Sequence, residues 1–268
     1  MTDEYPKFLY KYRTIDDLKN IVGNPSLKAL LKNEIAFSNK DNFNDLFDSK
    51  IKLIKPTPKQ FRDLKKHLNK QDSQQIASCI NKEEFTLEGY DLIERLIELF
   101  NRQVSTYYYF LCLSKNNNSN LMWSHYASSH TGFCIEFKTE YIKANKVTYK
   151  SNIPTINIID LVKLKFKLGD DEKLGYKIWD SLRTKLIEWE YEEEYRFQAS
   201  NSMLHGKVKK DHSYCMMDYK SEFIESIIFG CRMPSKIKTY IVENMHENIK
   251  YKEVKECDSS LEVVAYEP

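Results

Sequence analysis

Hydrophobic and polar residues alternate in several short stretches of the chain, which is the pattern of half-buried β-strands. The first stretch is Phe-Leu-Tyr-Lys-Tyr-Arg-Thr at 8–14, and shorter runs rich in β-branched and aromatic residues follow it. Further strands are predicted at 34–38, 107–113, 132–138, 146–149, 223–230, 250–254 and 261–266. A sheet is therefore expected at the core of the fold.

The segment 189–198 alternates most regularly. As a strand it places aromatic rings on one face (Trp189, Tyr191, Tyr195 and Phe197) and charged groups on the other (Glu190, Glu192, Glu194 and Arg196). Carboxylates at alternate positions of a strand lie about 7 Å apart and repel one another unless they share a cation. On a solvent-exposed face this repulsion is tolerated, whereas in a cleft Glu192 or Glu194 becomes a candidate for catalysis.

Apolar residues three or four positions apart predict helices between the strands. These helices are expected at 15–22 (with Thr14 as N-cap), 26–31, 121–128 and 234–245, twice within 156–188, and over much of 56–100. The chain contains no low-complexity linker and no internal repeat. We therefore predict one α+β domain over 1–268, with a mixed, mainly antiparallel sheet core and a helical insertion at about 56–105.

Glycine is scarce, with 7 in 268 residues, whereas average usage would give roughly 19. The glycines are so far apart that neither G-x-G-x-x-G nor G-x-x-x-x-G-K occurs. Both motifs need glycines so that the backbone can approach a phosphate closely. The sequence therefore excludes a Rossmann-type dinucleotide site and a P-loop.

Charge and cysteine content limit which partners and which kinds of site the protein can have. The chain has 41 Lys plus Arg against 39 Asp plus Glu, so any contact with nucleic acid requires a local basic patch. The six cysteines are isolated and form no C-x-x-C pair, so we expect reduced thiols and no metal site. The chain does not start with a basic segment followed by an apolar run, and it has no stretch of about 18 apolar residues. We expect a cytoplasmic protein without a membrane partner.

Four short segments combine aromatic rings with ionisable or amide groups, which is how small-ligand sites are usually built. They are 10–13, 42–45, 122–126 together with His130, and 189–196. Structural explanations remain open for three of them: a surface ion pair of Arg13, a turn at 42–45, and a hydrogen-bonded histidine at 125. The spacing of His125 and His130 does not suit a shared metal ion on a helix or a strand.

Taken in order, these segments resemble the bacterial family of domains of unknown function 2971. The family pattern runs LYKYR, FNDPFD, LMWSHYA followed by H-x-G-x-C-x-E-F, then W-x-Y-E-x-E-Y-R and I-x-x-G. The corresponding residues here are Leu9–Arg13, Phe43–Asp48, Leu121–Phe137, Trp189–Arg196 and Ile227–Gly230. Leu46 stands where the family usually has proline, which loosens the turn after Asp45. The family name records no activity, so the resemblance implies fold and site positions.

A looser resemblance, to ADP-ribosyltransferases, implies a mechanism. In that group a basic residue on the first strand holds the adenosine side of NAD, aromatic rings stack the nicotinamide, and a glutamate on a late strand binds the ribose. The carboxylate stabilises the oxocarbenium-like ribose that forms when nicotinamide leaves. By this resemblance the catalytic residues are Glu194, Glu192 and His125, and the cofactor-binding residues are Lys11, Tyr12, Arg13, Asn44, Asp45, Trp123, Tyr126 and Arg196.

The resemblances predict an enzyme with NAD as substrate, which transfers ADP-ribose to a protein or nucleic-acid target or hydrolyses NAD. Its biological role, as a toxin, an anti-phage defence effector or a housekeeping factor, stays open. Two other functions stay open. Aromatic and basic residues at 10–13, with Lys207–Lys210, are typical of a nucleic-acid-binding or nucleic-acid-processing protein. Tyr107–Tyr109 and the helical insertion are typical of a non-catalytic protein-interaction module. A cleft shared by the four segments favours the enzyme.

Overall fold

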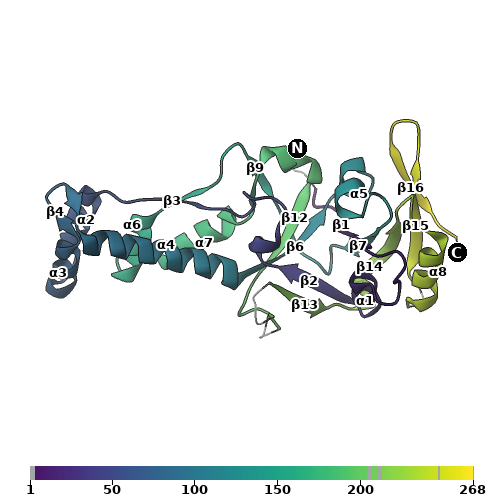
Figure 1. The fold of residues 1–268 in the computed structure, drawn as a ribbon, viewed down its shortest axis with the longest axis horizontal. Coiled ribbons are helices and arrows are strands. Elements are labelled where there is room, and N and C mark those ends of the chain that lie inside the picture. Colours follow the sequence, from purple (N-terminus) through teal and green to yellow (C-terminus); the bar gives the residue numbers. More distant parts are fainter. Residues whose placement is uncertain (1–3, 205–206, 210–212, 247, 268) are drawn as a thin grey trace. The chain divides into compact units, whose positions relative to one another are not determined.

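The structure is a computed structural model that describes residues 4–204, 207–209, 213–246 and 248–267 (Figure 1). It divides into two compact units. Unit 1 consists of Met1–Asn39, Tyr109–Val147 and Glu188–Pro268, and unit 2 consists of Lys40–Tyr108 and Thr148–Ile187. The predicted helical insertion at about 56–105 falls in unit 2, together with 148–187. That the whole chain forms one domain stays a prediction.

Unit 1 is built on one sheet, which contains ten of the described strands. In chain order they are β1 (Phe8–Arg13), β2 (Glu34–Ser38), β6 (Tyr108–Ser114), β7 (Phe133–Lys138), β8 (Asn145–Lys146), β12 (Glu194–Ser200), β13 (Tyr214–Asp218), β14 (Ile224–Phe229), β15 (Lys250–Glu256) and β16 (Leu261–Ala265). The order across the sheet is β13-β2-β6-β1-β7-β14-β15-β16, and β12 joins β6 to β8. β14 and β15 are parallel, while β7 is antiparallel to both β1 and β14. The predicted α+β class with a mixed, mainly antiparallel sheet is confirmed.

Two faces of this sheet are packed differently. The α1/α8 face is covered by α1 (Pro25–Leu31) and α8 (Ser235–Asn244), whose residues join Leu9 of β1 in a large apolar core. The α5 face is covered by α5 (Asn120–Tyr126), which packs on Tyr10 and Tyr12 in a smaller cluster. Alternation along β1 therefore sends neighbouring residues into two different environments.

The helix predicted at 15–22 is wrong, because these residues form turns. The Asp17 carboxylate accepts the Lys19 backbone N–H, and the Asn20 side chain accepts that of Gly23. Such local side-chain bonds satisfy the backbone without a helix. The neighbouring α1 does form, because the Asn24 side chain caps it by accepting two backbone N–H groups.

The strand predicted over 189–198 is wrong in its first half. Residues Ile187–Glu192 form a 3₁₀ helix, Glu193 has a left-handed backbone with φ of 41°, and β12 begins only at Glu194. Tyr195 therefore belongs to the α1/α8 core, whereas Tyr191 packs with the α5 cluster. A period of two in the sequence does not distinguish a continuous strand from a 3₁₀ helix that is followed, after one left-handed residue, by a strand.

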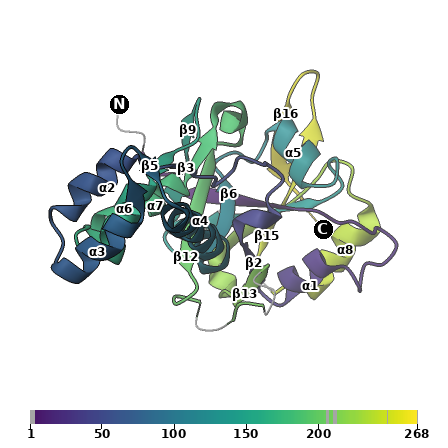
Figure 2. The same ribbon diagram turned by 60° about the vertical axis from the view of Figure 1, so that its left-hand side comes forward.

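Unit 2 is mainly helical (Figure 2). Its helices are α2 (Pro58–Lys65), α3 (Lys70–Ser78), α4 (Leu87–Tyr107), α6 (Ile158–Lys165) and α7 (Asp171–Ser181), with a 3₁₀ turn at Lys40–Asn42. Short strand pairs accompany them: β3 (Lys52–Ile54) with β10 (Thr155–Asn157), β9 (Thr148–Lys150) with β11 (Thr184–Leu186), and β4 (Ile80–Asn81) with β5 (Glu84–Phe85). No helix in the described part of the chain combines the length and hydropathy that a membrane span requires.

Candidate functional site

The first strand separates the predicted binding residues. Tyr10 and Tyr12 point to the α5 face, so Lys11 and Arg13 alternate to the opposite side. The guanidinium of Arg13 donates from Nη2 to Ser26 Oγ of α1 at 3.3 Å. The structure therefore does not bring Arg13 together with the aromatic residues of α5. The pKa of the Arg13 guanidinium is lowered, mainly because the group is buried.

Lys11 reaches toward β6. β1 and β6 pair at Tyr10 and Ser114, and the Lys11 ammonium donates to the Cys112 carbonyl at 3.0 Å. Burial lowers the pKa of Lys11, and the negative charge of Glu194 is close enough to oppose that shift. Lys11, unlike Arg13, therefore belongs to the same neighbourhood as a predicted catalytic carboxylate.

The loop between β6 and α5 ties three parts of the site together. Its Asn116 carbonyl accepts the Tyr12 hydroxyl at 2.7 Å, and its Asn117 carbonyl accepts the Trp123 indole N–H at 2.7 Å. The rings of Tyr12 and Trp123 meet edge to face with centroids 5.1 Å apart. Because Trp123 is fully buried, its ring supports the loop and offers no surface on which a ligand can stack.

Glu192 is held from two sides. Its Oε1 accepts the Tyr126 hydroxyl at 2.5 Å, and its backbone carbonyl accepts Ser114 Oγ at 2.7 Å. The side-chain amide of Asn116 donates to the adjacent Glu193 carboxylate. Glu192 is only 4% exposed, so its carboxyl group has a fixed position at the end of the 3₁₀ helix.

Aromatic rings border this carboxylate. His125 is exposed, while Tyr126, Tyr191 and Trp189 are half-buried. The His125 ring lies 6.4 Å from the rings of both Tyr126 and Tyr191, and Tyr191 lies 6.0 Å from Trp189. We call the rings of His125, Tyr126 and Tyr191 the aromatic rim. The sequence did not place Tyr191 here, because its position depends on the 3₁₀ helix.

Glu194 and Arg196 form an ion pair inside β12. Arg196 donates to Glu194 Oε1 from Nε at 2.9 Å and lies with Nη2 at 2.8 Å from the same oxygen. Arg196 is 0% exposed, and its guanidinium lies 5.2 Å from the centroid of the Phe110 ring. Glu194 and Arg196 therefore share one face of β12, as predicted, and both β12 and β1 pair with β6.

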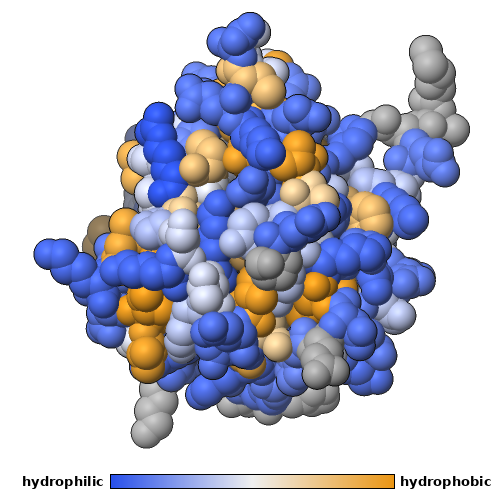
Figure 3. All heavy atoms as spheres, turned by 90° about the vertical axis from the view of Figure 1, so that its right-hand side faces the viewer, coloured by the Kyte–Doolittle hydropathy of each residue, from blue (hydrophilic) through white to orange (hydrophobic). Residues whose placement is uncertain are grey.

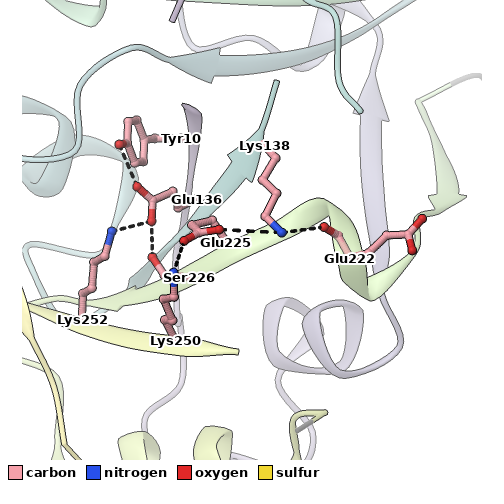
Figure 4. Close-up of polar contacts among 8 residues, drawn as sticks. All are labelled: Tyr10, Glu136, Lys138, Glu222, Glu225, Ser226, Lys250 and Lys252. Atoms are coloured by element: carbon pink, nitrogen blue, oxygen red, sulfur yellow. Dashed lines mark hydrogen bonds and ion pairs between the residues drawn. The ribbon is translucent and has the colours of Figure 1, made fainter. Parts of the chain in front are cut away.

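A buried carboxylate that sequence reasoning missed lies further along the α5 face. Glu136 of β7 is 2% exposed and accepts hydrogen bonds from Tyr10 at 2.9 Å, from Lys252 at 2.6 Å and from Ser226. Figure 4 shows these three side chains pointing to Glu136 from different strands. Burial is the main reason that the pKa of Tyr10 is raised, and the Glu136 charge adds to it. The signal was a lone acid in the apolar run at 133–137.

The remaining predicted segments make local contacts. Asn44 and Asp45 belong to unit 2, where Asp45 Oδ1 accepts the Phe47 N–H at 2.8 Å, as expected of a turn. Lys207 pairs with Asp218 at 2.9 Å. Lys210 lies outside the described residues.

Of the three consecutive tyrosines, Tyr107 is exposed and Tyr109 is buried. They therefore do not form one exposed aromatic surface.

Comparison with known proteins finds a family match over part of the chain. Residues 122–197 match the family described as "Protein of unknown function (DUF2971)". This segment contains α5 from Met122 onward, β7, the 3₁₀ helix up to Glu192, and the Glu194–Arg196 pair, so the predicted resemblance to this family is confirmed there. Comparisons with curated proteins and with solved structures found no match.

Proposed function

We propose that unit 1 is an NAD-using enzyme of the ADP-ribosyltransferase type. It breaks the bond between nicotinamide and ribose and transfers ADP-ribose to a macromolecular target or to water. The observation that carries the proposal is the Glu192 carboxylate, which is buried, bonded to Tyr126 at 2.5 Å and bordered by the aromatic rim. An apolar wall with one aimed polar group is the usual construction of a small-ligand site.

The chemistry assigns separate roles to the two carboxylates. Nicotinamide leaves with the electron pair of the glycosidic bond, and the ribose that remains carries a positive charge on its ring oxygen and anomeric carbon. A fixed carboxylate stabilises this charge, because it needs no reorganisation as the charge develops. Glu194 is paired with Arg196, so we assign the ribose to Glu192 and the alignment of β12 to Glu194.

The aromatic rim accounts for the rest of the substrate. The planar nicotinamide ring stacks on the rings of Tyr191 or His125, whose surfaces are partly open. His125 is also within this rim, where it accepts the proton that the attacking nucleophile loses. A nucleic-acid site through Lys11 and Arg13 has less support, because both side chains are directed into the fold rather than toward a phosphate backbone.

Glu192→Gln tests the proposal. Glutamine keeps an oxygen that accepts the Tyr126 hydroxyl but removes the negative charge. Nicotinamide release, measured by chromatography with and without added protein and RNA targets, is expected to fall about 100-fold or more, while calorimetry still detects NAD binding. Glu190→Gln is the matched control, because Glu190 is exposed on the same 3₁₀ helix.

Two results would overturn the assignment. The first is absence of both NAD binding and nicotinamide release in the unchanged protein. The second is full activity of Glu192→Gln with an unchanged melting temperature, which would remove Glu192 from the reaction.

A further inference from the structure

A cavity of about 570 Å³ lies beside β15 and β16 in unit 1. Asn117, Lys250 and Lys252 contribute polar groups to its lining, and Val263 and Ala265 contribute apolar ones. The volume is within the range of small-molecule sites. Figure 3 looks onto the end of unit 1 that carries β15, β16 and α8, where hydrophobic side chains form small patches among hydrophilic ones.

The two lysines have donors to spare. Lys250 and Lys252 occupy alternate positions of β15 and so share one face. Lys252 donates to Glu136 at 2.6 Å, and Lys250 donates to Glu225 at 2.5 Å. An ammonium group has three N–H donors, and within the described part of the chain each lysine uses one in a hydrogen bond. Two N–H groups on each lysine are therefore available to a ligand.

The surrounding charges favour an anion. Figure 4 shows the ammonium groups of Lys138, Lys250 and Lys252 arranged around the carboxylates of Glu136 and Glu225. Among the residues that line the cavity, Lys250 and Lys252 are basic and none is acidic. Tyr10 and Ser226 also donate to Glu136, which further reduces the effect of its charge on a neighbouring anion.

The buried acid also prepares Lys252 for binding. Glu136 is fixed by donors from β1, β14 and β15, so the Lys252 ammonium is held in one place before a ligand arrives. Ordering a lysine side chain on binding costs about 0.5–1.5 kcal/mol of free energy. Because Lys252 is already held by Glu136, a ligand that binds it loses less than this.

We propose that this cavity binds a small organic phosphate monoester. The phosphate dianion lies between Lys250 and Lys252, and the side-chain amide of Asn117 is in the lining to donate to it. The organic group lies against Val263 and Ala265. Two ammonium groups suit a phosphate better than a carboxylate, because a phosphate monoester carries about 1.5–2 negative charges at neutral pH. The site is independent of NAD chemistry at Glu192.

Phenyl phosphate is the probe, with inorganic phosphate and phenol as its two halves. Calorimetry on the full chain is expected to show phenyl phosphate binding more tightly than either half. Lys250→Ala should weaken it about tenfold or more, as expected for a charge-assisted hydrogen bond. This variant should fold, because the Lys250 side chain is 70% exposed. Lys255→Ala on the same strand is the control, because Lys255 does not line the cavity.

The outcomes separate this proposal from the proposed enzyme. Equal binding by the unchanged protein and Lys250→Ala, or no binding of phenyl phosphate at all, would overturn the phosphate site. Equal affinity for inorganic phosphate would contradict the role of the apolar wall. Glu192→Gln should bind phenyl phosphate normally, so a loss in that variant would place the ligand at the carboxylate site instead.

Discussion

The two faces of the sheet in unit 1 bury different kinds of side chain, although the same strands form both faces. On the α1/α8 face, strands and helices bury an apolar core that includes Leu9, Phe229 and Ile237. On the α5 face the apolar cluster is smaller, and the buried carboxylate of Glu136 accepts a hydrogen bond from Tyr10 of that cluster. The comparison indicates that one face stabilises the fold while the other holds the candidate chemistry.

The largest expected effect is on the apolar face. Phe229 is fully buried and stacks on Tyr251 with ring centroids 5.8 Å apart. Phe229→Ala should lower the free energy of unfolding by about 3–5 kcal/mol, through lost burial and the cavity it leaves. Urea denaturation measures this change. The half-buried Phe8 on the α5 face is the control, and an equal loss for Phe8→Ala would break the comparison.

The next largest effect on stability is expected for the ion pair between Lys252 and the buried Glu136. Lys252→Met removes the cation from Glu136, which then remains buried with a negative charge. Breaking a buried ion pair is strongly destabilising. Because the Lys252 side chain is 28% exposed, we expect a smaller loss of about 2 kcal/mol in urea denaturation.

A second substitution sharpens that result. Glu136→Gln in the Lys252→Met background removes the unpaired charge, so part of the stability should return. A double variant that is no more stable than the single one would show that packing rather than charge explains the loss.

A smaller effect is expected for the loop that supports the site. Tyr12→Phe removes the hydroxyl that donates to the Asn116 carbonyl but keeps the ring against Trp123. The free energy of unfolding should fall by about 1 kcal/mol, the net value of one hydrogen bond. Nicotinamide release should fall as well, because Asn116 also holds Glu193. Unchanged release with reduced stability would separate the loop from the reaction.

The smallest effect depends on pH. His130 is buried, its Nε2 lies 3.1 Å from Ser124 Oγ, and burial, with Arg232 as a second cause, lowers its pKa below the ordinary 6.5. As the pH falls below 6.5, the unfolded chain binds a proton at this histidine before the folded protein does. Stability should therefore decrease from pH 6.5 down to the lower pKa of the folded state.

Paired substitutions test the source of that pH dependence. His130→Gln should flatten the decrease below pH 6.5, measured by urea denaturation at several pH values. His125→Gln should leave it in place, because His125 is exposed. If His125→Gln flattened the decrease and His130→Gln did not, the pH dependence of stability would be assigned to His125.

Local patterns predicted what depends on local geometry. Alternation predicted that Glu194 and Arg196 share a face, and they form an ion pair. The same rule, applied to 8–14, already implied that Arg13 and Tyr12 point in opposite directions, although both were assigned to one site. The position of Tyr191 was not predictable, because it follows from the left-handed backbone at Glu193.

The sequence does not identify which residues contact each other across long stretches of chain. Glu136 and Lys252 are 116 residues apart. The sequence pattern around either residue gives no information about the other. A lone acid in an apolar strand indicated that a partner must exist, but only the sheet order identifies which residue it is.

The order of strands also constrains synthesis. Glu136 on β7 precedes its neighbour Ser226 on β14 by 90 residues. At about 5–20 residues per second, the ribosome needs roughly 5 to 20 s to deliver that neighbour. During this interval the nascent chain displays the apolar strand 133–137 with one open edge, which is the kind of segment that chaperones protect.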